Sequence, residues 1–560
     1  MSRSAKIFLT VVLLLLIPTL FIFMVSWATL SAPHPTQQGT LQLPGLQDEV
    51  RVLRDRYGVA HIYAQNEHDL FMAQGYVHAQ DRFWQMEFWR YTGQGRLSEI
   101  IGEAGVDSDR FIRTAGWNRV GEATVDYYRT EAPDFYEILE LYSAGVNAYL
   151  AENGNNTSIN QTILTAVNGP REIEPWTPLN TVTWGVVMAH DLGGNYSTEL
   201  RRARLLEAVG PELVEQLMPP YPYDRRPVIA PTDLLAPMPG GTTAVNPSAI
   251  NWRNVNLDLV GATPPNGFAL GTSDFAGSNN WVIGGAHTAS GLPLLADDPH
   301  LGIQMPSIWY QVGLHAPGFN VTGFSFAGVP GVIVGYNDRI AWGVTNVGPD
   351  TQDLFIEKIN PANPNQYEFQ GEWRDMEIIE EVIKVSGGED IVLPVRFTHH
   401  GPILSDEVDA GDQVLAFQWT SHQPSPLLQS VILLNRAQNF EEFVSALRYW
   451  DAAGQNIVYA DVDGNIGYQA TGVVPVRRNG DGTVPVPGWT GEYEWVGTIP
   501  YEEMPRLYNP PAGYIVTANN AVVDEDYPHF IDRDWADGDR AQRIETMVAD
   551  LIAEKGQLTA

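Results

Sequence analysis

Apolar positions divide the chain into stretches of different pattern. Between residues 50 and 224 they recur mainly at intervals of three and four, as in the run from Phe135 to Leu150, and this spacing predicts amphipathic helices. Two short strands, Val50–Leu53 and Ala60–Tyr63, are expected ahead of the helices because a Tyr-Gly turn lies between them. The first half of the chain is therefore expected to be largely helical.

The pattern changes in two steps further along the chain. Residues 227–277 are rich in proline and glycine and nearly free of charge, which is typical of a spacer or a surface loop. Beyond them the apolar runs shorten to strand length, as in Trp281–Ile283, Trp309–Leu314 and Gly331–Val334, and the turn at residues 463–465 predicts a hairpin. The second half is expected to be rich in strands.

An uncharged apolar stretch, Ile7–Leu30, follows Arg3 and Lys6 at the N-terminus. As a helix it would extend about 36 Å, enough to cross a hydrocarbon core of about 30 Å. Because signal peptides have apolar regions of only about 7–15 residues, residues 1–32 are interpreted as a signal anchor, with a signal peptide cut near Ala32 as the alternative. The positive charges place the body outside the cytoplasm, either membrane-anchored or secreted to the periplasm.

The composition excludes several functional classes. The 560 residues include 67 acidic and 33 basic side chains, a net charge of −34, so a basic surface for nucleic acid is not expected. The absence of cysteine rules out disulfides, cysteine–zinc sites and a cysteine nucleophile. With 44% apolar residues, the chain can still bury a large core.

Common catalytic motifs are missing. The sequence has no GxxxxGK[ST] phosphate loop and no HExxH zinc motif, and GFSFA, which begins at Gly323, lacks the final glycine of a nucleophile elbow. Asp461 begins a run that resembles a calcium loop, but the remaining ligands are lacking, which favours a turn. His399 and His400 are interpreted as a pair at a strand end rather than as a metal site.

The junction between the spacer and the second half can carry chemistry of its own. Gly277 tolerates the strained backbone that an N-to-O acyl shift requires, so Ser278 could attack the preceding carbonyl and cleave the chain. The new N-terminal serine would hold its own base, because an α-amine with a pKa of about 7.7–8.0 is partly unprotonated near neutral pH. An ordinary loop-to-strand junction is the alternative interpretation of these two residues alone.

Separated motifs in a fixed order give this junction a specific context. They are RDRYGVAHIYA, GYVHAQDRFWQMEFWR, GSNNWVIGG, GYNDRIAWGVTN, YADVDGNIGY, VPVPG, GYIVTANN and DYP, within residues 50–544. With them the sequence resembles the penicillin acylase family of N-terminal-nucleophile amidases, which includes penicillin G, cephalosporin and acyl-homoserine lactone acylases. The resemblance implies an α+β fold, an αββα sandwich of two stacked, mostly antiparallel sheets with a helical N-terminal segment, and a heterodimer of self-cleaved chains.

The resemblance also implies roles for individual residues. The positions that match the family's catalytic residues are Ser278 for the nucleophile, the backbone N–H of Asn346 and the side chain of Asn519 for the oxyanion hole, and Arg540 for an arginine that organises the site. Val347 is the alternative source of the backbone N–H. His300 is expected to contact the nucleophile or its amine, and the bond between Gly277 and Ser278 is the expected cleavage site.

A structural calcium ion is a further implication of the resemblance, whereas no organic cofactor is implied. The matching ligands are the carboxylates of Glu199, Asp350, Asp353 and Asp532 and the carbonyl oxygens of Gln352 and Gly482. Oxygen ligands from several segments suit calcium, which takes about 6–8 of them. The same carboxylates could equally be ordinary surface acids.

Two positions bear on the substrate, because Leu301 and Val334 stand where the acyl pocket of penicillin G acylases has aromatic residues. An aliphatic lining favours an alkyl chain, although such changes discriminate by only about 1–3 kcal/mol. We expect hydrolysis of linear amide bonds in N-acylated small molecules, with acyl-homoserine lactones or other aliphatic acyl amides preferred. A β-lactam acylase and an inactive, membrane-anchored binding or remnant protein are the alternatives.

These assignments divide the chain into four parts: residues 1–32 as the anchor or signal peptide, 33–226 as a largely helical first segment, 227–277 as the spacer, and 278–560 as the catalytic segment. In the family the catalytic segment normally continues further. The sequence is therefore expected to be a C-terminally truncated member.

Overall fold

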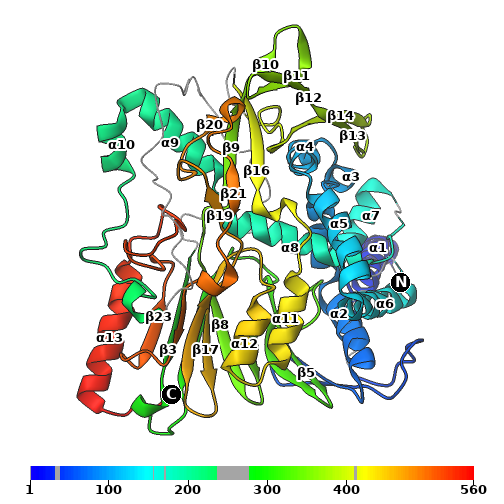
Figure 1. Cartoon of the computed structure of the whole chain (residues 1–560). Coiled ribbons are helices and arrows are strands. Elements are labelled where there is room, and N and C mark those ends of the chain that lie inside the picture. Colours follow the sequence, from blue (N-terminus) through cyan, green and yellow to red (C-terminus); the bar gives the residue numbers. More distant parts are fainter. Residues whose placement is uncertain are drawn as a thin grey trace.

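The computed structural model describes residues 2–31, 34, 38–154, 157–169, 172–235, 277–408 and 413–560. Helices dominate the described residues before the spacer and strands dominate those after it, which confirms a mixed α+β fold with a helical first segment (Figure 1). The helices are α1 (Arg3–Ser31), α2 (Glu67–Gly93), α3 (Ser98–Ile101), α4 (Val106–Ala115), α5 (Trp117–Glu131), α6 (Pro133–Asn153), α7 (Ile159–Asn168), α8 (Pro178–Gly193), α9 (Tyr196–Val209), α10 (Pro211–Leu217), α11 (Leu427–Arg436), α12 (Phe440–Leu447) and α13 (Asp539–Lys555).

The two opening strands are present as expected. β1 (Arg51–Arg54) and β2 (Ala60–Tyr63) pair in antiparallel fashion, with Arg54 opposite Ala60. β2 also runs parallel to β5 (Trp309–Ala316), a pairing that the local pattern did not indicate. The segments before and after the spacer therefore share one sheet.

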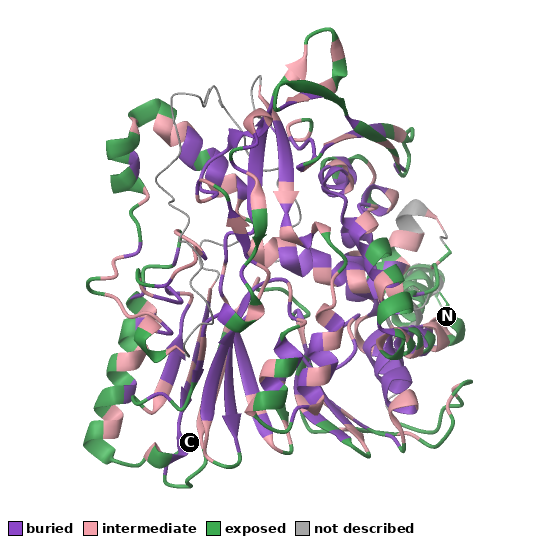
Figure 2. Cartoon of the chain, viewed as in Figure 1, coloured by how far each residue is buried: buried purple, intermediate pink, exposed green. Residues whose placement is uncertain are grey.

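That sheet has nine strands in the order β1-β2-β5-β6-β7-β8-β17-β18-β22. Its remaining members are β6 (Phe319–Phe326), β7 (Val334–Asn337), β8 (Ile340–Asn346), β17 (Gln455–Asp461), β18 (Ile466–Ala470) and β22 (Arg506–Tyr508). Every residue of β17 is buried, so this strand is covered on both faces (Figure 2).

A small antiparallel sheet covers one face of the large one. β3 (Gly277–Ile283) lies between β23 (Tyr514–Thr517) and β4 (Leu294–His300), and both β3 and β4 contact β8 and β17. On the outer side, α13 packs against β3 and β23.

The opposite face of the large sheet is covered by helices. Alternate residues of β17 point to different cores, because side chains in a strand alternate between faces. Val458 packs in a cluster with Val282 of β3, whereas Tyr459 packs with Leu434 of α11 and Phe443 of α12. Two stacked sheets thus lie between helical layers, and the Gly277–Ser278 junction begins an inner strand.

The other strands form small sheets in the upper half of Figure 1. They are β9 (Gln352–Glu357) with β16 (Val414–Trp419) and β20 (Val486–Pro487), β10 (Ile359–Asn360) with β11 (Asn363–Phe369) and β12 (Glu372–Asp375), β13 (Glu377–Ile383) with β14 (Ile391–Thr398) and β15 (Gly401–Pro402), and β19 (Pro475–Arg477) with β21 (Trp495–Thr498).

A predicted hairpin turn and a predicted strand can be compared with the structure. The predicted hairpin is confirmed as β17 and β18, and Asp461 accepts hydrogen bonds from the backbone N–H groups of Asp463 and Asn465, so it forms a turn as predicted. The predicted strand at residues 331–334 is wrong, because only Val334 belongs to a strand.

The physical reason lies in two buried side chains. Gln74 bonds both backbone polar groups of Gly331, and Asn435 bonds both of Val332. These side-chain contacts replace the backbone hydrogen bonds to a neighbouring strand that a strand in a sheet would make.

The expected spacer lies mostly outside the described residues. Its first part, 227–235, is packed into the body, where Ile229 and Ala230 donate backbone hydrogen bonds to Ala521 and Val522. Residues 236–276 are not described, so the spacer's extent stays a prediction. Across the described ranges, no helix meets the length and apolarity needed to traverse a bilayer.

Candidate active site

Ser278 lies in a buried position where β3 begins. It stands opposite Pro299 in the pairing of β3 with β4, and only 5% of its surface is exposed. Its Oγ donates a hydrogen bond of 2.7 Å to the carbonyl oxygen of Gly277, and its backbone N–H donates one of 2.6 Å to Oδ1 of Asn519. The hydroxyl therefore lies against the carbonyl group that a self-cleavage reaction would attack.

Asn519 follows β23 and links the two sides of the junction. Its φ of 62° lies in the left-handed region, which asparagine tolerates better than most residues. While Oδ1 accepts from Ser278, Nδ2 donates to the backbone oxygen of Asn346 at 2.9 Å. One of the two Nδ2 protons remains for another acceptor.

Arg540, in the first turn of α13, fixes the same backbone segment. Its guanidinium donates to the carbonyl oxygen of Ser278 at 2.6 Å, to Oδ1 of Asn279 at 2.8 Å and to Oδ1 of Asn519 at 2.8 Å. A Cβ on Gly277 would lie 2.9 Å from this guanidinium and 3.2 Å from Oδ1 of Asn519. Only glycine fits before Ser278 without displacing these groups.

The strand register distinguishes between the two candidate backbone donors. Val347 donates its N–H to the carbonyl of Gly454, so Asn346, one residue earlier, is a non-hydrogen-bonded position opposite Gln455. The N–H of Asn346 thus points away from β17, and β7 on that side pairs only as far as Trp342. The geometry favours Asn346 over Val347.

His300 lies beside the junction without touching the nucleophile. It stands opposite Gly277 in the strand register, but its Nε2 is 2.8 Å from Oδ2 of Asp298 and 3.4 Å from Nδ2 of Asn279. Among the contacts of the described residues, none joins the imidazole to Ser278. In the uncut chain its contact is with Asp298, not with the nucleophile as expected.

A cavity with about 1020 Å³ of empty space, part of it open to solvent, lies beside Ser278. Its lining is almost entirely apolar and includes Leu301, Ile333, Val344, Trp184, Trp309 and Phe326. Leu301 lines the cavity as expected, whereas Ile333 takes the place expected for its neighbour Val334. The aromatic members were missed because their helical or strand spacing is also that of ordinary core residues.

A second, more polar cavity also borders the nucleophile. Ser278, Leu301 and Asn346 line both cavities, and the second one is also lined by the carboxylates Asp191, Asp532 and Asp534. Burial and the neighbouring Asp534 raise the pKa of Asp532 to about 7. Asp532, an expected calcium ligand, therefore faces the candidate active site.

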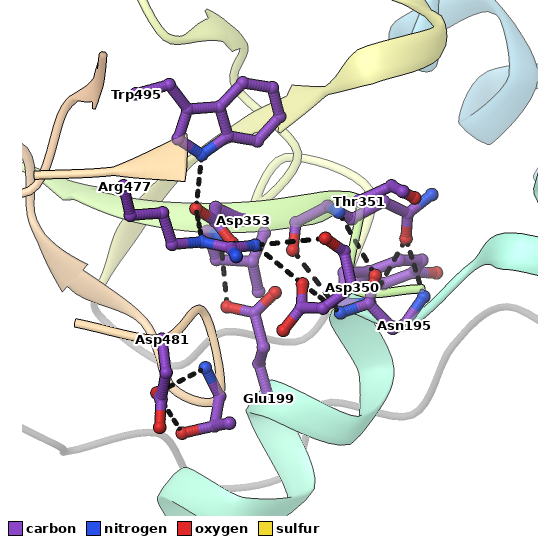
Figure 3. A network of polar contacts seen from close by, with 12 residues as sticks. Asn195, Glu199, Asp350, Thr351, Asp353, Arg477, Asp481 and Trp495 are labelled. Carbon is purple, nitrogen blue, oxygen red and sulfur yellow. Dashed lines mark hydrogen bonds and ion pairs between the residues drawn. The ribbon is translucent and has the colours of Figure 1, made fainter. Parts of the chain in front are cut away.

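The other expected calcium ligands lie around an arginine (Figure 3). Arg477 forms ion pairs of 2.7 Å with both Asp350 and Asp353. Oε2 of Glu199 accepts the backbone N–H of Leu354, whereas its buried Oε1 has no partner among the described residues. The remaining expected ligands are the carbonyl oxygens of Gly482, a residue that packs against the guanidinium, and of Gln352, whose carbonyl oxygen lies 3.5 Å from Nδ2 of Asn195. Among the described residues, no three of these carboxylates bring ligand oxygens within 4.8 Å of one another, so this arrangement does not fit the ion.

His399 and His400 form the turn between β14 and β15, as expected from the sequence. His400 bonds Glu357 at 2.8 Å and Glu494 at 3.1 Å. His399, His400 and Glu494 are also the one described group whose ligand atoms are close enough to hold a metal ion. Their mutual hydrogen bonds and ion pairs account for this arrangement.

Most of the chain matches one family of known proteins. Residues 49–560 match the family model described as penicillin amidase, and the chain belongs to that family. Similar proteins include the penicillin acylase 2 proenzyme of Pseudomonas sp. strain SE83, with 33% identity over 93% of this chain and 65% of that protein. The acyl-homoserine lactone acylase QuiP of Pseudomonas aeruginosa is 31% identical over 91% and 59%, and penicillin G acylase of Escherichia coli is 30% identical over 92% and 65%.

The chain thus spans between 59% and 65% of the length of these relatives. Among solved structures, a thermostable penicillin G acylase from Alcaligenes faecalis matches with 31% identity, 49% coverage of each chain and a TM-score of 0.42.

Proposed function

We propose that this chain is a self-processing N-terminal-nucleophile amidohydrolase that cuts itself before Ser278. Oγ of Ser278 would attack the carbonyl carbon of Gly277, and the bond to the Ser278 nitrogen would break as that nitrogen takes a proton. Water would then hydrolyse the resulting ester, leaving a carboxylate on Gly277 and a free hydroxyl and α-amine on Ser278. Atoms and charge balance without a cofactor.

The observation that carries this proposal is the way in which two side chains hold the junction. Asn519 accepts the N–H of Ser278, and Arg540 binds both the carbonyl of Ser278 and the amide of Asn519. The nitrogen that would become the α-amine is therefore held in place before any cut. Because β2 and β5 pair across the two segments, the cut chains would stay together as a heterodimer.

The same groups would then hydrolyse an amide substrate. Oγ attacks the substrate carbonyl while the α-amine accepts the hydroxyl proton and passes it to the leaving amine. The N–H of Asn346 and the second Nδ2 proton of Asn519 would stabilise the oxyanion, where each donor is worth about 3–4 kcal/mol. Water completes the cycle by hydrolysing the acyl-enzyme.

We propose aliphatic acyl amides, such as acyl-homoserine lactones, as the preferred substrates. The apolar cavity would take the acyl chain, and the polar cavity would take the leaving amine, because both meet at Ser278. Aromatic members such as Trp309 and Phe326 also suit a phenylacetyl group, so a β-lactam acylase is the second candidate. The relatives include proteins named for each activity.

Self-cleavage is tested by intact mass and N-terminal sequencing of the protein beside a Ser278→Ala variant. A second chain beginning Ser-Asn-Asn-Trp, absent from the variant, is the expected result. An uncut chain in both preparations would contradict the proposal and favour a non-catalytic remnant protein.

Substrate preference is tested by comparing kcat/KM for decanoyl and phenylacetyl amides of one amine. Faster turnover of the decanoyl amide is expected, and an equal or slower rate would favour the β-lactam acylase. Location outside the cytoplasm, anchored through residues 1–32, stays a prediction that protease treatment of intact cells can test.

A further inference from the structure

The buried side chain of Arg477 contacts carboxylates that the family resemblance assigns to calcium. Only 4% of this side chain is exposed, and it reaches from β19 to the segment that leads into β9. Nη2 lies 2.7 Å from an oxygen of Asp350 and 2.7 Å from an oxygen of Asp353, and Nε lies 2.7 Å from the other oxygen of Asp353. The planar guanidinium therefore binds two carboxylates at once.

Three of the four oxygens of these carboxylates accept from N–H donors. Oδ1 of Asp350 also accepts from Nδ2 of Asn195 at 2.8 Å, and Oδ2 of Asp353 accepts from Nε1 of Trp495 at 2.5 Å (Figure 3). Calcium would need about 6–8 oxygen ligands facing one point. Here the same oxygens face a guanidinium, an amide and an indole.

Gly482 marks the space that the guanidinium occupies. Its φ of 75° and its position leave no room for a side chain, because a Cβ would lie 2.6 Å from Cζ of Arg477 and 2.6 Å from Oδ1 of Asp353. The expected carbonyl ligand thus belongs to a residue packed directly on the guanidinium.

Glu199 completes the acidic surroundings. It is buried, its Oε2 accepts the backbone N–H of Leu354, and its Oε1 has no partner among the described residues. Its oxygens are therefore not bound to the guanidinium of Arg477.

We infer that Arg477 is a built-in cation that takes the place of a calcium ion in this protein. It belongs to a cluster that joins parts of the chain on opposite sides of the spacer, because Asp350, which Arg477 binds, also accepts from Asn195 at the N-cap of α9. The two segments are thereby held together without an added metal.

The unmodified protein provides the first test. After treatment with a chelator, calorimetric titration with calcium chloride is expected to show no stoichiometric binding, and the melting temperature is expected to change by less than about 1 °C with chelator or calcium. Binding of one calcium ion per chain, with a lower melting temperature in chelator, would overturn the inference.

An Arg477→Ala variant provides the second test. Removing one partner of a buried ion pair leaves uncompensated charge, so we expect the melting temperature to fall by about 5 °C or more. Millimolar calcium or guanidinium should restore part of this loss only in the variant. Arg478→Ala is the matched control, because the neighbouring Arg478 donates to the carbonyl of Gly491 outside the cluster.

Equal melting temperatures for the two alanine variants would contradict the inference. If Arg477→Ala does not fold, Arg477→Lys keeps the charge while losing the planar fork, and we expect it to fold with reduced stability and to remain insensitive to chelator. A lysine variant whose folding requires calcium would equally overturn the inference. None of these measurements depends on catalysis, so their outcome is separate from that of the proposed function.

Discussion

The amide oxygen of Asn519 lies 2.6 Å from the backbone nitrogen of Ser278, although the two residues are 241 positions apart in the chain. This contact places the side chain at the atom that would change from an amide nitrogen to an α-amine. The same side chain also donates to the carbonyl of Asn346. Asn519 is therefore positioned to act in both self-cleavage and hydrolysis.

An Asn519→Gly variant should test that dual role. Glycine preserves the left-handed backbone but removes the amide, so we expect kcat on an acyl amide to fall by about 10²–10³ and self-cleavage to slow in parallel. The matched control is Asn509→Gly, at another left-handed asparagine outside the site. A variant that cleaves and turns over as fast as the control would remove Asn519 from the mechanism.

Gly277→Ala should block or slow the cut by crowding. The added Cβ would lie 2.9 Å from the Arg540 guanidinium and 3.2 Å from the Asn519 amide, so these groups must move. Mass spectrometry over time is expected to show mostly uncut chain. Gly193→Ala serves as control, because its Cβ would meet nothing closer than 3.9 Å, and processing at the normal rate is expected there.

Neighbouring residues alone show that a Gly-Ser step could cleave itself, but preferring this over an ordinary loop-to-strand junction required the family resemblance. Asn519 and Arg540 could be assigned only through the family resemblance, since no local pattern links them to Ser278. Arg477 was missed for a similar reason. Its meaning depends on the fold bringing β19 beside Asp350 and Asp353, and VPVRR reads locally as an ordinary strand.

The fold shows the same division between local and distant information. Helices before the spacer and strands after it follow from periodicity, and so does the pairing of β1 with β2. The parallel pairing of β2 with β5 joins residues about 250 positions apart, and the local sequence of neither strand indicates it. The run from Gly331 to Val334 looks extended, but side chains from helices satisfy its backbone instead of a neighbouring strand.

His400 should make the stability of the folded protein depend on pH. Although burial alone would lower it, the pKa of His400 is raised by hydrogen bonds to Glu357 and Glu494. A histidine whose pKa is raised by folding stabilises the folded protein. This stabilisation is complete below the pKa of the unfolded state, about 6.5, and is lost as pH rises through the pKa of the folded state. The melting-temperature difference between the protein and His400→Gln should therefore be largest below about pH 6.5 and shrink above it.

Glu357→Gln tests the cause, because it removes one of the two carboxylates that raise the pKa of His400. In that variant the pH-dependent loss of stability should move to lower pH. A difference between wild type and His400→Gln that stays constant from pH 5 to about pH 9 would contradict this assignment of charge.

Asp297 should also make the stability of the fold depend on pH. Although Asp297 is an acid and His400 a base, the contribution of each to stability falls as pH rises. It faces Asn280 in the pairing of β3 with β4, and burial raises its pKa to about 8. Between about pH 4, the pKa of an unfolded aspartate, and about pH 8, the folded state keeps a proton that the unfolded state has lost, so stability falls as pH rises through this range. Asp297→Asn, which cannot ionise, should be more stable near pH 8 by on the order of 2 kcal/mol.

Thermal melts at pH 5 and near pH 8 are the measurement for this variant. The neighbouring Asp298→Asn is the control, because its carboxylate is exposed and its removal should change stability little at either pH. An Asp297→Asn protein less stable than wild type near pH 8 would show that the carboxylate is ionised and satisfied in the fold.

The adjacent residues Ile333 and Val334 differ in their contact with the apolar cavity beside Ser278. Both are buried, but Ile333 lines the cavity beside Ser278, whereas Val334 begins β7 opposite Phe324. Ile333→Ala should lower the ratio of kcat/KM for decanoyl over hexanoyl amides by about 10-fold, because lost contacts in a hydrophobic pocket are worth about 1–3 kcal/mol. Val334→Ala should lower the free energy of unfolding by about 1–3 kcal/mol and leave that kcat/KM ratio unchanged. A ratio that shifts with Val334 rather than with Ile333 would mean that the chain enters from the other side of β7, and the acyl site would have to be assigned elsewhere.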